Sequence, residues 1–129
     1  MMASEPQFLT LEQVEAVHDR SLSEHGGSQG LRDIGGLESA VIQPQHVYFY
    51  EQADLFEIAA AYAFHIAEAQ AYLDGNKRTA VASALIFLEL NGIETTGIDP
   101  MELYAPMIRI AEGELDRAGL AEQMCELFG

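Results

Sequence analysis

Apolar positions along the chain recur mainly at intervals of three and four residues, the period of amphipathic α-helices. No stretch alternates apolar and polar residues as a β-hairpin does, and residues 93–98 form the only strand-like piece. The pattern predicts five or six helices, over residues 10–23, 37–43, 54–71, 76–91, 99–113 and 115–128. The sequence therefore predicts a compact, single-domain, all-α helical bundle that spans residues 1–129.

Several expected helix limits follow from capping residues. Thr10 and Gln13 have the spacing of a capping box, in which each side chain accepts a hydrogen bond from the other residue's main-chain N–H. Asp54 is suited to cap the helix that follows it. Pro106 lies too deep in its helix for the first turn, so a kink is expected there.

Pro44 is expected to stop the helix at 37–43, because proline removes a main-chain donor and clashes with the preceding turn. Residues 45–53 are then predicted to be a loop that carries three adjacent aromatic side chains, at positions 48–50. Such a loop either acts as a mobile lid near a site or folds back onto the core. The sequence favours neither alternative.

The helix at 76–91 is apolar on nearly all sides, which indicates a central helix surrounded by others. Asp74 and Gly75 form a turn signal immediately before it. Lys77 and Arg78 therefore fall in the first turn of this helix, where the helix dipole is already positive and cations are unfavourable. That placement needs a reason other than helix stability.

The charge balance of the chain excludes two classes of partner. The formal net charge is −15, from 21 acidic and 6 basic residues. Nucleic acids and anionic membranes both attract basic surfaces, so neither is expected to bind. The longest apolar run, at 80–88, is far shorter than the ~20 residues of a membrane span. The start of the chain lacks the basic region of a signal peptide, and we expect a cytoplasmic protein.

A single cysteine, Cys125, excludes an internal disulfide and is expected to lie in the core. His18 is expected to be a packed histidine on the first helix. Arg32 and Asp33 are adjacent in the glycine-rich loop that follows, and are expected to pair and hold that loop in place.

The scarce positive charge is concentrated at one turn. Lys77 is the only lysine, and Arg78 is one of five arginines. Unpaired N–H groups, the positive end of a helix dipole and two cations together favour a bound anion, most plausibly phosphate. Asp74 is placed to hold a magnesium ion, which relies on phosphate oxygens for further ligands. The alternative is that Asp74 only caps the helix and both cations are solvated.

Residues 70–78 read Q-A-Y-L-D-G-N-K-R, close to the motif H-x-F-x-(D/N)-(G/A)-N-K-R. The motif resembles that of the death-on-curing (Doc) branch of the Fic/Doc, or Fido, family. The likeness extends along the chain through G-L-R-D at 30–33, L-E-S-A at 37–40, F-L-E-L-N-G at 87–92 and A-E-G-E-L at 111–115. The resemblance implies an all-helical fold in which the motif loop joins two central helices.

The resemblance also implies an activity. Fic relatives, which have Gly at the position of Lys77, usually transfer AMP from ATP to a protein hydroxyl. Doc-like members, which have Lys, resemble kinases that pass the terminal phosphate of ATP to a translation elongation factor. They act as toxins that are paired with an antitoxin. ATP with magnesium is then the expected substrate, and no tightly bound cofactor is expected.

The resemblance assigns a role to each residue of this chain that matches a functional position of the motif. By the resemblance, Asp74 serves the metal ion and Asn76 contacts the phosphate. Lys77 and Arg78 neutralise the phosphate charge of the nucleotide, and Gly75 lets the backbone approach the phosphate. These five residues are the expected nucleotide site.

The resemblance breaks at Gln70, where the family has the histidine that removes the proton from the acceptor hydroxyl. Such a general base is typically worth ~10²–10⁴ in rate, and a neutral amide cannot take a proton. His65 lies about 140° away around the same helix and is expected to be a packed histidine. Ala71 and Tyr72 also replace the usual Pro and Phe, with Tyr72 as the core anchor. Three neighbouring differences favour divergence over a single engineered replacement.

Three functions remain open. The chain is a Doc-like phosphotransferase impaired by Gln70, a pseudoenzyme that binds nucleotide or an antitoxin-type protein, or a helical scaffold in which the motif is only a cap. Some Fic relatives carry a self-inhibiting segment S/T-x-x-x-E-(G/N). The one Glu followed by Gly or Asn is Glu112, and Ile108 occupies the Ser/Thr position. Restraint by a separate antitoxin is therefore expected.

Overall fold

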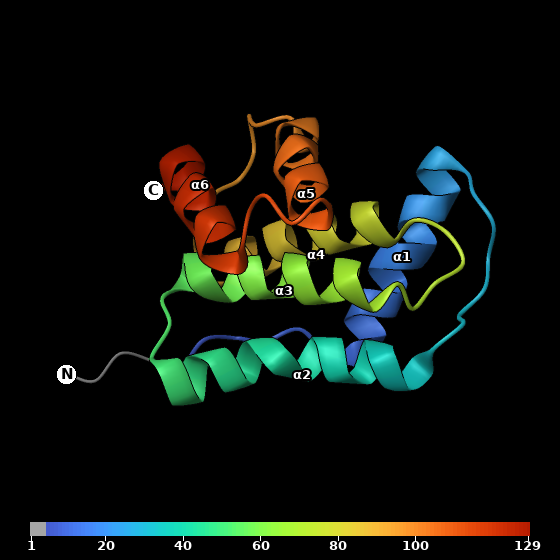
Figure 1. The fold of residues 1–129 in the computed structure, drawn as a ribbon, viewed down its shortest axis with the longest axis horizontal. Helices are drawn as coiled ribbons and strands as arrows, with labels where there is room; N and C mark the ends of the chain where they lie inside the picture. Colours follow the sequence, from blue (N-terminus) through green and yellow to red (C-terminus); the bar gives the residue numbers. More distant parts are fainter. Residues whose placement is uncertain (1–4) are drawn as a thin grey trace.

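Six α-helices and one short 3-10 helix make up residues 5–129, the part of the chain that the computed structural model describes (Figure 1). They are α1 (Leu11–His25), α2 (Ile34–Glu51), α3 (Leu55–Ala69), α4 (Asn76–Leu90), η1 (Pro100–Leu103), α5 (Tyr104–Ala111) and α6 (Arg117–Phe128). Residues 5–129 contain no β-strand, only an isolated bridge between Leu31 and Tyr72. The all-α prediction is confirmed, and residues 93–98 are irregular, with a turn at Thr96 and Gly97.

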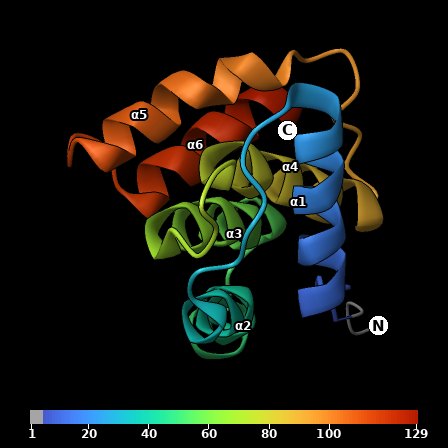
Figure 2. The same ribbon diagram turned by 90° about the vertical axis from the view of Figure 1, so that its right-hand side faces the viewer.

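The helices lie in three layers with one helix across their end. In Figure 1, α3 and α4 form the middle layer, α2 lies on one side of it, and α5 with α6 lies on the other. Figure 2 shows α1 running across the ends of these layers, beside α4. The loop between α3 and α4 and the segment between α1 and α2 therefore meet at the same end of the molecule (Figure 1). No helix within residues 5–129 is long and apolar enough to cross a membrane.

Helix α3 is the most enclosed element. Residues 58–63 are all buried, so the helix is covered on every side and not only along the expected apolar face. Four alanines in this stretch let α2, α4 and α6 approach closely. The helix begins with a capping box in which Asp54 and Glu57 bond each other's main-chain N–H groups. Its other end is held by this packing.

Helix α4 is central as predicted, and it begins at Asn76. Phe87 and Leu88 are fully buried against the rest of the core, and the Phe87 ring lies 5.2 Å from that of Tyr62 on α3. Burial raises the pKa of Tyr62 to about 12, and the Tyr62 hydroxyl accepts a hydrogen bond from Leu9 N at 2.8 Å. The two central helices are thus tied into one core.

The prediction that Pro44 ends a helix was wrong. Helix α2 continues through Pro44 to Glu51, and Pro44 itself is buried. An interior proline costs about 3 kcal/mol, and the buried face of the helix offsets that cost. This face repeats at helical spacing on both sides of the proline, and consists of Leu37, Ala40, Val41, Pro44 and Val47. Packing against α3 therefore overrides the local signal.

The aromatic residues at 48–50 lie on α2 and not on a loop. Tyr48 packs edge-on against Phe8, with ring centroids 5.8 Å apart. Phe49 and Tyr50 are exposed. This end of α2 lies at the opposite end of the molecule from the loop between α3 and α4 (Figure 1), so these aromatics form no lid over that loop.

Three further predictions were wrong, two of them near the carboxyl end. The helix at 99–113 is divided into η1 and α5, so Pro106 falls in the first turn of α5, where proline is tolerated. Cys125 is exposed on α6 rather than buried, because Leu120, Ala121 and Met124 face the core instead. Arg32 and Asp33 do not pair either, and the Asp33 side chain caps α2 through Gly36 N at 2.9 Å.

Candidate functional site

The loop between α3 and α4 is a tight connection that depends on two left-handed residues. Gln70 ends α3 with φ 45° and Gly75 precedes α4 with φ 80°. Glycine adopts this conformation readily, whereas a residue with a side chain does so at a cost. Asn76 closes the loop, because its Oδ1 accepts from Tyr72 N at 3.0 Å and its Nδ2 donates to Tyr72 O at 2.9 Å. The start of α4 is thus fixed relative to Tyr72.

The segment at 26–33, between α1 and α2, runs beside this loop and bonds its main chain. The bonds are Leu73 N to Gly30 O at 3.0 Å, Arg32 N and Asp33 N to Ala71 O at 2.6 and 3.1 Å, and Arg32 Nη2 to Gln70 O at 2.8 Å. We call this segment the clamp. It supplies partners for polar groups that a loop would otherwise expose to water.

His18 holds the loop from the side of α1. Its ring stacks on the Tyr72 ring, with centroids 3.5 Å apart and planes 7° from parallel. Its Nε2 lies 2.8 Å from the Asp74 carbonyl oxygen. In the tautomer that carries the proton on Nε2, this nitrogen donates a hydrogen bond to that oxygen. Both rings are buried, which confirms His18 as a packed histidine and Tyr72 as the core anchor. Burial, followed by the nearby carboxylates Glu15 and Asp19, raises the pKa of Tyr72 to about 12.

Asp74 is exposed, and its carboxylate faces the clamp. Oδ1 accepts from Gly75 N at 2.8 Å and Oδ2 accepts from Ser28 N at 3.2 Å. Each oxygen keeps a further lone pair. Within residues 5–129, no three His, Cys, Asp or Glu side chains gather in a way that would hold a metal ion. Any magnesium ion at Asp74 therefore needs most of its ligands from outside the protein.

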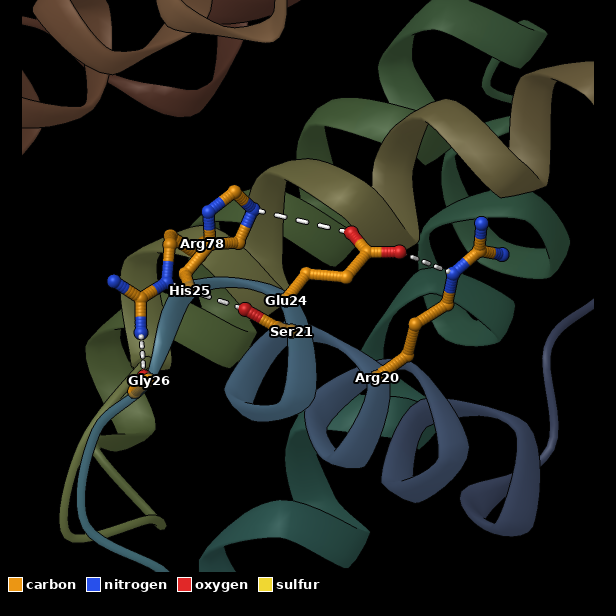
Figure 3. A network of polar contacts seen from close by, with 6 residues as sticks. All are labelled: Arg20, Ser21, Glu24, His25, Gly26 and Arg78. Carbon is orange, nitrogen blue, oxygen red and sulfur yellow. Dashed lines mark hydrogen bonds and ion pairs between the residues drawn. The ribbon is translucent and has the colours of Figure 1, made fainter.

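Arg78 turns toward α1. Its Nε donates to Ser21 Oγ at 3.2 Å and its Nη2 donates to Gly26 O at 3.0 Å (Figure 3). Its other terminal nitrogen has no hydrogen bond within residues 5–129. Arg78 lines an apolar cavity of about 360 Å³ that lies between α1 and α4. Arg20, Glu24 and His25, all on α1, also line this cavity, and Arg20 pairs with Glu24 at 2.9 Å.

Lys77 lies in a different cavity from Arg78. That cavity has a volume of about 450 Å³, and α3, α4 and α5 contribute its walls. It is lined by Ala67, Glu68, Gln70, Asn76, Lys77, Met107, Ile110 and Ala111. The first turn of α4 has no side-chain cap, so its main-chain N–H groups remain available beside this cavity. We call it the motif cavity, since it holds Gln70, Asn76 and Lys77.

His65 does not line the motif cavity. Its Nε2 lies 3.4 Å from Arg117 Nη1. Burial, and then the positive charge of Arg117, lowers its pKa, while Glu68 acts in the opposite direction. Arg117 is also paired with Glu51 at 3.3 Å. His65 therefore joins α3 to α6, and its partner is a guanidinium on another helix.

Sequence reasoning missed the clamp, the bond from His18 to Asp74 and the presence of Glu68 in the motif cavity. Apart from the Arg32 side chain, the clamp works through main-chain groups, which leave no side-chain pattern to detect. The run of glycines at 26–30 was the one available signal, because such a run allows close approach of two backbones. Glu68 is two residues from Gln70. An acidic residue in an exposed helical turn is common, so its position gave no signal of a role in the cavity.

The fold and the motif loop belong to a known class. Residues 8–88 match the model of the Fic/DOC family, so the chain belongs to that family. The chain is 36% identical over 124 residues to "Protein kinase doc" of Escherichia phage P1, with 95% of this chain and 97% of that protein covered. It is 42% identical over 71 residues to "Toxin Doc" of Mycolicibacterium smegmatis, with 54% of this chain and 55% of that protein covered. The chain thus lies in the Doc branch.

Proposed function

We propose that the chain is a Doc-like toxin of a toxin–antitoxin pair, which transfers the terminal phosphate of ATP to a hydroxyl of a translation elongation factor. The main support is the motif cavity, where Gln70, Asn76 and Lys77 meet at the uncapped start of α4. Packing of α3 and α4 and the clamp hold that geometry in place, as phosphoryl transfer requires. The names of the two relatives agree with this proposal.

In this proposal the triphosphate lies at the start of α4. Lys77 supplies the compensating charge, and Gly75 lets the backbone approach the phosphates. Asn76 contributes its main-chain N–H and the amide hydrogen that Tyr72 does not use. Arg78 lines the other cavity and adds only positive potential at this end of α4. Asp74 provides the one protein carboxylate to a magnesium ion that arrives with the nucleotide and whose charge helps to neutralise the phosphates.

The glutamine at position 70 is the reason to consider a second candidate function beside the proposed toxin. A carboxamide orients an acceptor hydroxyl but does not remove its proton, so the rate is expected to be low. The second candidate is a pseudoenzyme that binds nucleotide in the motif cavity, or an antitoxin-type protein, without transfer. The exposed amide of Gln70, in a motif loop that keeps residues 74–78 of the family pattern, favours considering it.

The test uses the purified chain, Mg-ATP and a bacterial translation extract, with label on the γ- or α-phosphate in separate reactions. Transfer of γ-label to one extract protein supports the kinase, and transfer of α-label supports AMP transfer instead. The Gln70→His variant runs beside the parent chain. Transfer by the variant alone supports the pseudoenzyme. No transfer by either, with no nucleotide-dependent rise in melting temperature, would overturn both candidates.

A further inference from the structure

The motif cavity contains one carboxylate, Glu68. It lies in the last turn of α3, two residues before Gln70. Its side chain is exposed, and among residues 5–129 it makes no hydrogen bond or ion pair. It also borders a second cavity of about 390 Å³, which His65 and Asp33 line. Glu68 is therefore an unpaired acid at the edge of the proposed active site.

The position of Glu68 is unfavourable for helix stability. The carboxyl end of a helix carries partial negative charge, so an acidic residue there is unfavourable. The last turn of α3 has no basic residue to offset this cost. Glu68 also adds nothing to the core, because its side chain is exposed. A role in the cavity explains its presence better than a role in folding does.

The other polar residues of the motif cavity cannot accept a proton at neutral pH. Gln70 is a neutral amide, and Lys77 carries an ammonium group without an acceptor. Asn76 is an amide whose oxygen already accepts from Tyr72 N. The remaining lining residues are apolar. If a hydroxyl loses its proton in this cavity, Glu68 is the group that can receive it.

On the basis of the proposed function, we propose that Glu68 is the general base of this chain and takes the place of the missing histidine. The acceptor hydroxyl oxygen forms a bond to the γ-phosphorus. The bond from that phosphorus to the β–γ bridging oxygen breaks, and ADP leaves with the electron pair. The hydroxyl proton passes to a carboxylate oxygen of Glu68.

A carboxylate suffices for this chemistry. In protein kinases an aspartate accepts the proton of the substrate hydroxyl, so a carboxylate is basic enough for this role. The charged groups around Glu68 are Lys77 on α4, His65 on α3 and Asp33 at the start of α2. Helix α5 contributes only Met107, Ile110 and Ala111 to the motif cavity. Lys77 and the bound nucleotide thus set the local charge.

The experiment measures γ-label transfer by four chains: the parent, Glu68→Gln, Gln70→His, and the double variant. Glu126→Gln serves as the matched control, because Glu126 is exposed on α6 and lines neither cavity. Glu68→Gln is expected to lower the transfer rate by ~10²–10⁴-fold, the typical effect of a general base. Glu126→Gln should leave the rate unchanged. Unchanged melting temperatures would exclude unfolding as the cause.

Two further readouts distinguish a base from a structural residue. In the Gln70→His background, Glu68→Gln should have little effect, because the imidazole takes the proton instead. The acid limb of the pH–rate profile should differ between the parent and Gln70→His, because a carboxylate accepts the proton in one and an imidazole in the other. A residue that only shapes the cavity would show neither the dependence on the Gln70→His background nor the change in the pH–rate profile.

The failures of the two proposals are distinguishable. An active parent whose rate survives Glu68→Gln would reject Glu68 and leave the phosphotransferase standing. An inactive parent with an active Gln70→His variant would also reject Glu68, in favour of the pseudoenzyme. No transfer by any of the four chains would reject the phosphotransferase itself, and Glu68 with it.

Discussion

Arg32 Nη2 donates a hydrogen bond to the main-chain carbonyl oxygen of Gln70 at 2.8 Å. The bond joins the clamp to the last residue before the motif loop turns away from α3. It also satisfies a carbonyl at the end of a helix, where no intrahelical donor remains. Arg32 therefore helps to hold Gln70 in its left-handed conformation.

Replacing Arg32 with Met should loosen this junction while keeping most of the apolar stem. We expect the free energy of unfolding to fall by about 1 kcal/mol, the typical net value of one hydrogen bond. Urea denaturation measures the fall, and hydrogen exchange should show faster exchange at residues 70–73. Arg109→Met is the control, because the exposed Arg109 side chain has no hydrogen bond within residues 5–129. Equal effects of the two variants would contradict the assignment.

Gln70 and Gln52 form a matched pair, since both are glutamines that follow a helix with positive φ, at 45° and 54°. Glycine at either position should relieve the left-handed conformation and stabilise the protein by up to ~1 kcal/mol. Gln70→Gly keeps the main-chain oxygen that Arg32 binds, so similar gains are expected at the two positions. Thermal melting measures both. No gain at either position would contradict the cost assigned to the left-handed conformation.

Lys77→Ala should weaken nucleotide binding in the motif cavity without changing the fold, because the Lys77 side chain is exposed. A parent chain held at 100 times Kd for Mg-ATP should gain ~2.7 kcal/mol in stability. The variant should lose most of that gain at the same nucleotide concentration. Melting curves with and without Mg-ATP measure it, with Arg109→Ala as the control for a lost surface cation. Identical shifts in melting temperature on addition of Mg-ATP to all three chains would show that Lys77 does not belong to the nucleotide site.

Two buried tyrosines should respond oppositely to loss of the hydroxyl. Tyr62→Phe leaves Leu9 N without its acceptor, and should destabilise the protein by about 1–3 kcal/mol. The hydroxyl of Tyr72 is buried and has no partner among the described residues. Tyr72→Phe should therefore be neutral or stabilising, since it removes an unsatisfied polar group. Denaturation at neutral pH tests the contrast, and a matching loss in both variants would contradict it.

Both tyrosines should also make the fold sensitive to alkali. Burial raises the pKa of Tyr62 and of Tyr72 to about 12, against about 10 in an unfolded chain. Between these values the folded protein binds more protons than the unfolded one, so the free energy of unfolding falls as pH rises. Each Tyr→Phe variant should reduce the slope of that fall. Stability measured from pH 9 to 12 provides the check, and an unchanged slope would show that neither group titrates as expected.

Predictions from sequence succeeded where the determinants were local. Capping pairs such as Thr10–Gln13 and the turn at Asp74–Gly75 act within a few residues, and the structure confirms the helices that they begin. They failed at Pro44, because the packing of α2 against α3 is a long-range effect that no local signal carries. The exposure of Cys125 was missed for the same reason.

The candidate site was foreseen only in part. The motif loop and the start of α4 were located correctly, but Lys77 and Arg78 were expected to face one anion together. Successive residues of a helix point about 100° apart, and the structure places the two side chains in different cavities. Helical geometry alone would have predicted this. The clamp lay beyond prediction, since its bonds to the main chain of the motif loop come from main-chain groups, apart from the one that the Arg32 side chain donates.

The clamp has a consequence for how this family member can vary. Exposed, glycine-rich stretches between helices ordinarily tolerate extra residues well. Residues 26–33 are exposed and rich in glycine, yet successive main-chain groups there are matched to partners on the motif loop. One added residue would move every later group out of step with its partner. The length of this stretch is thus constrained more tightly than its amino-acid identities, and natural relatives should differ there by substitution rather than by insertion.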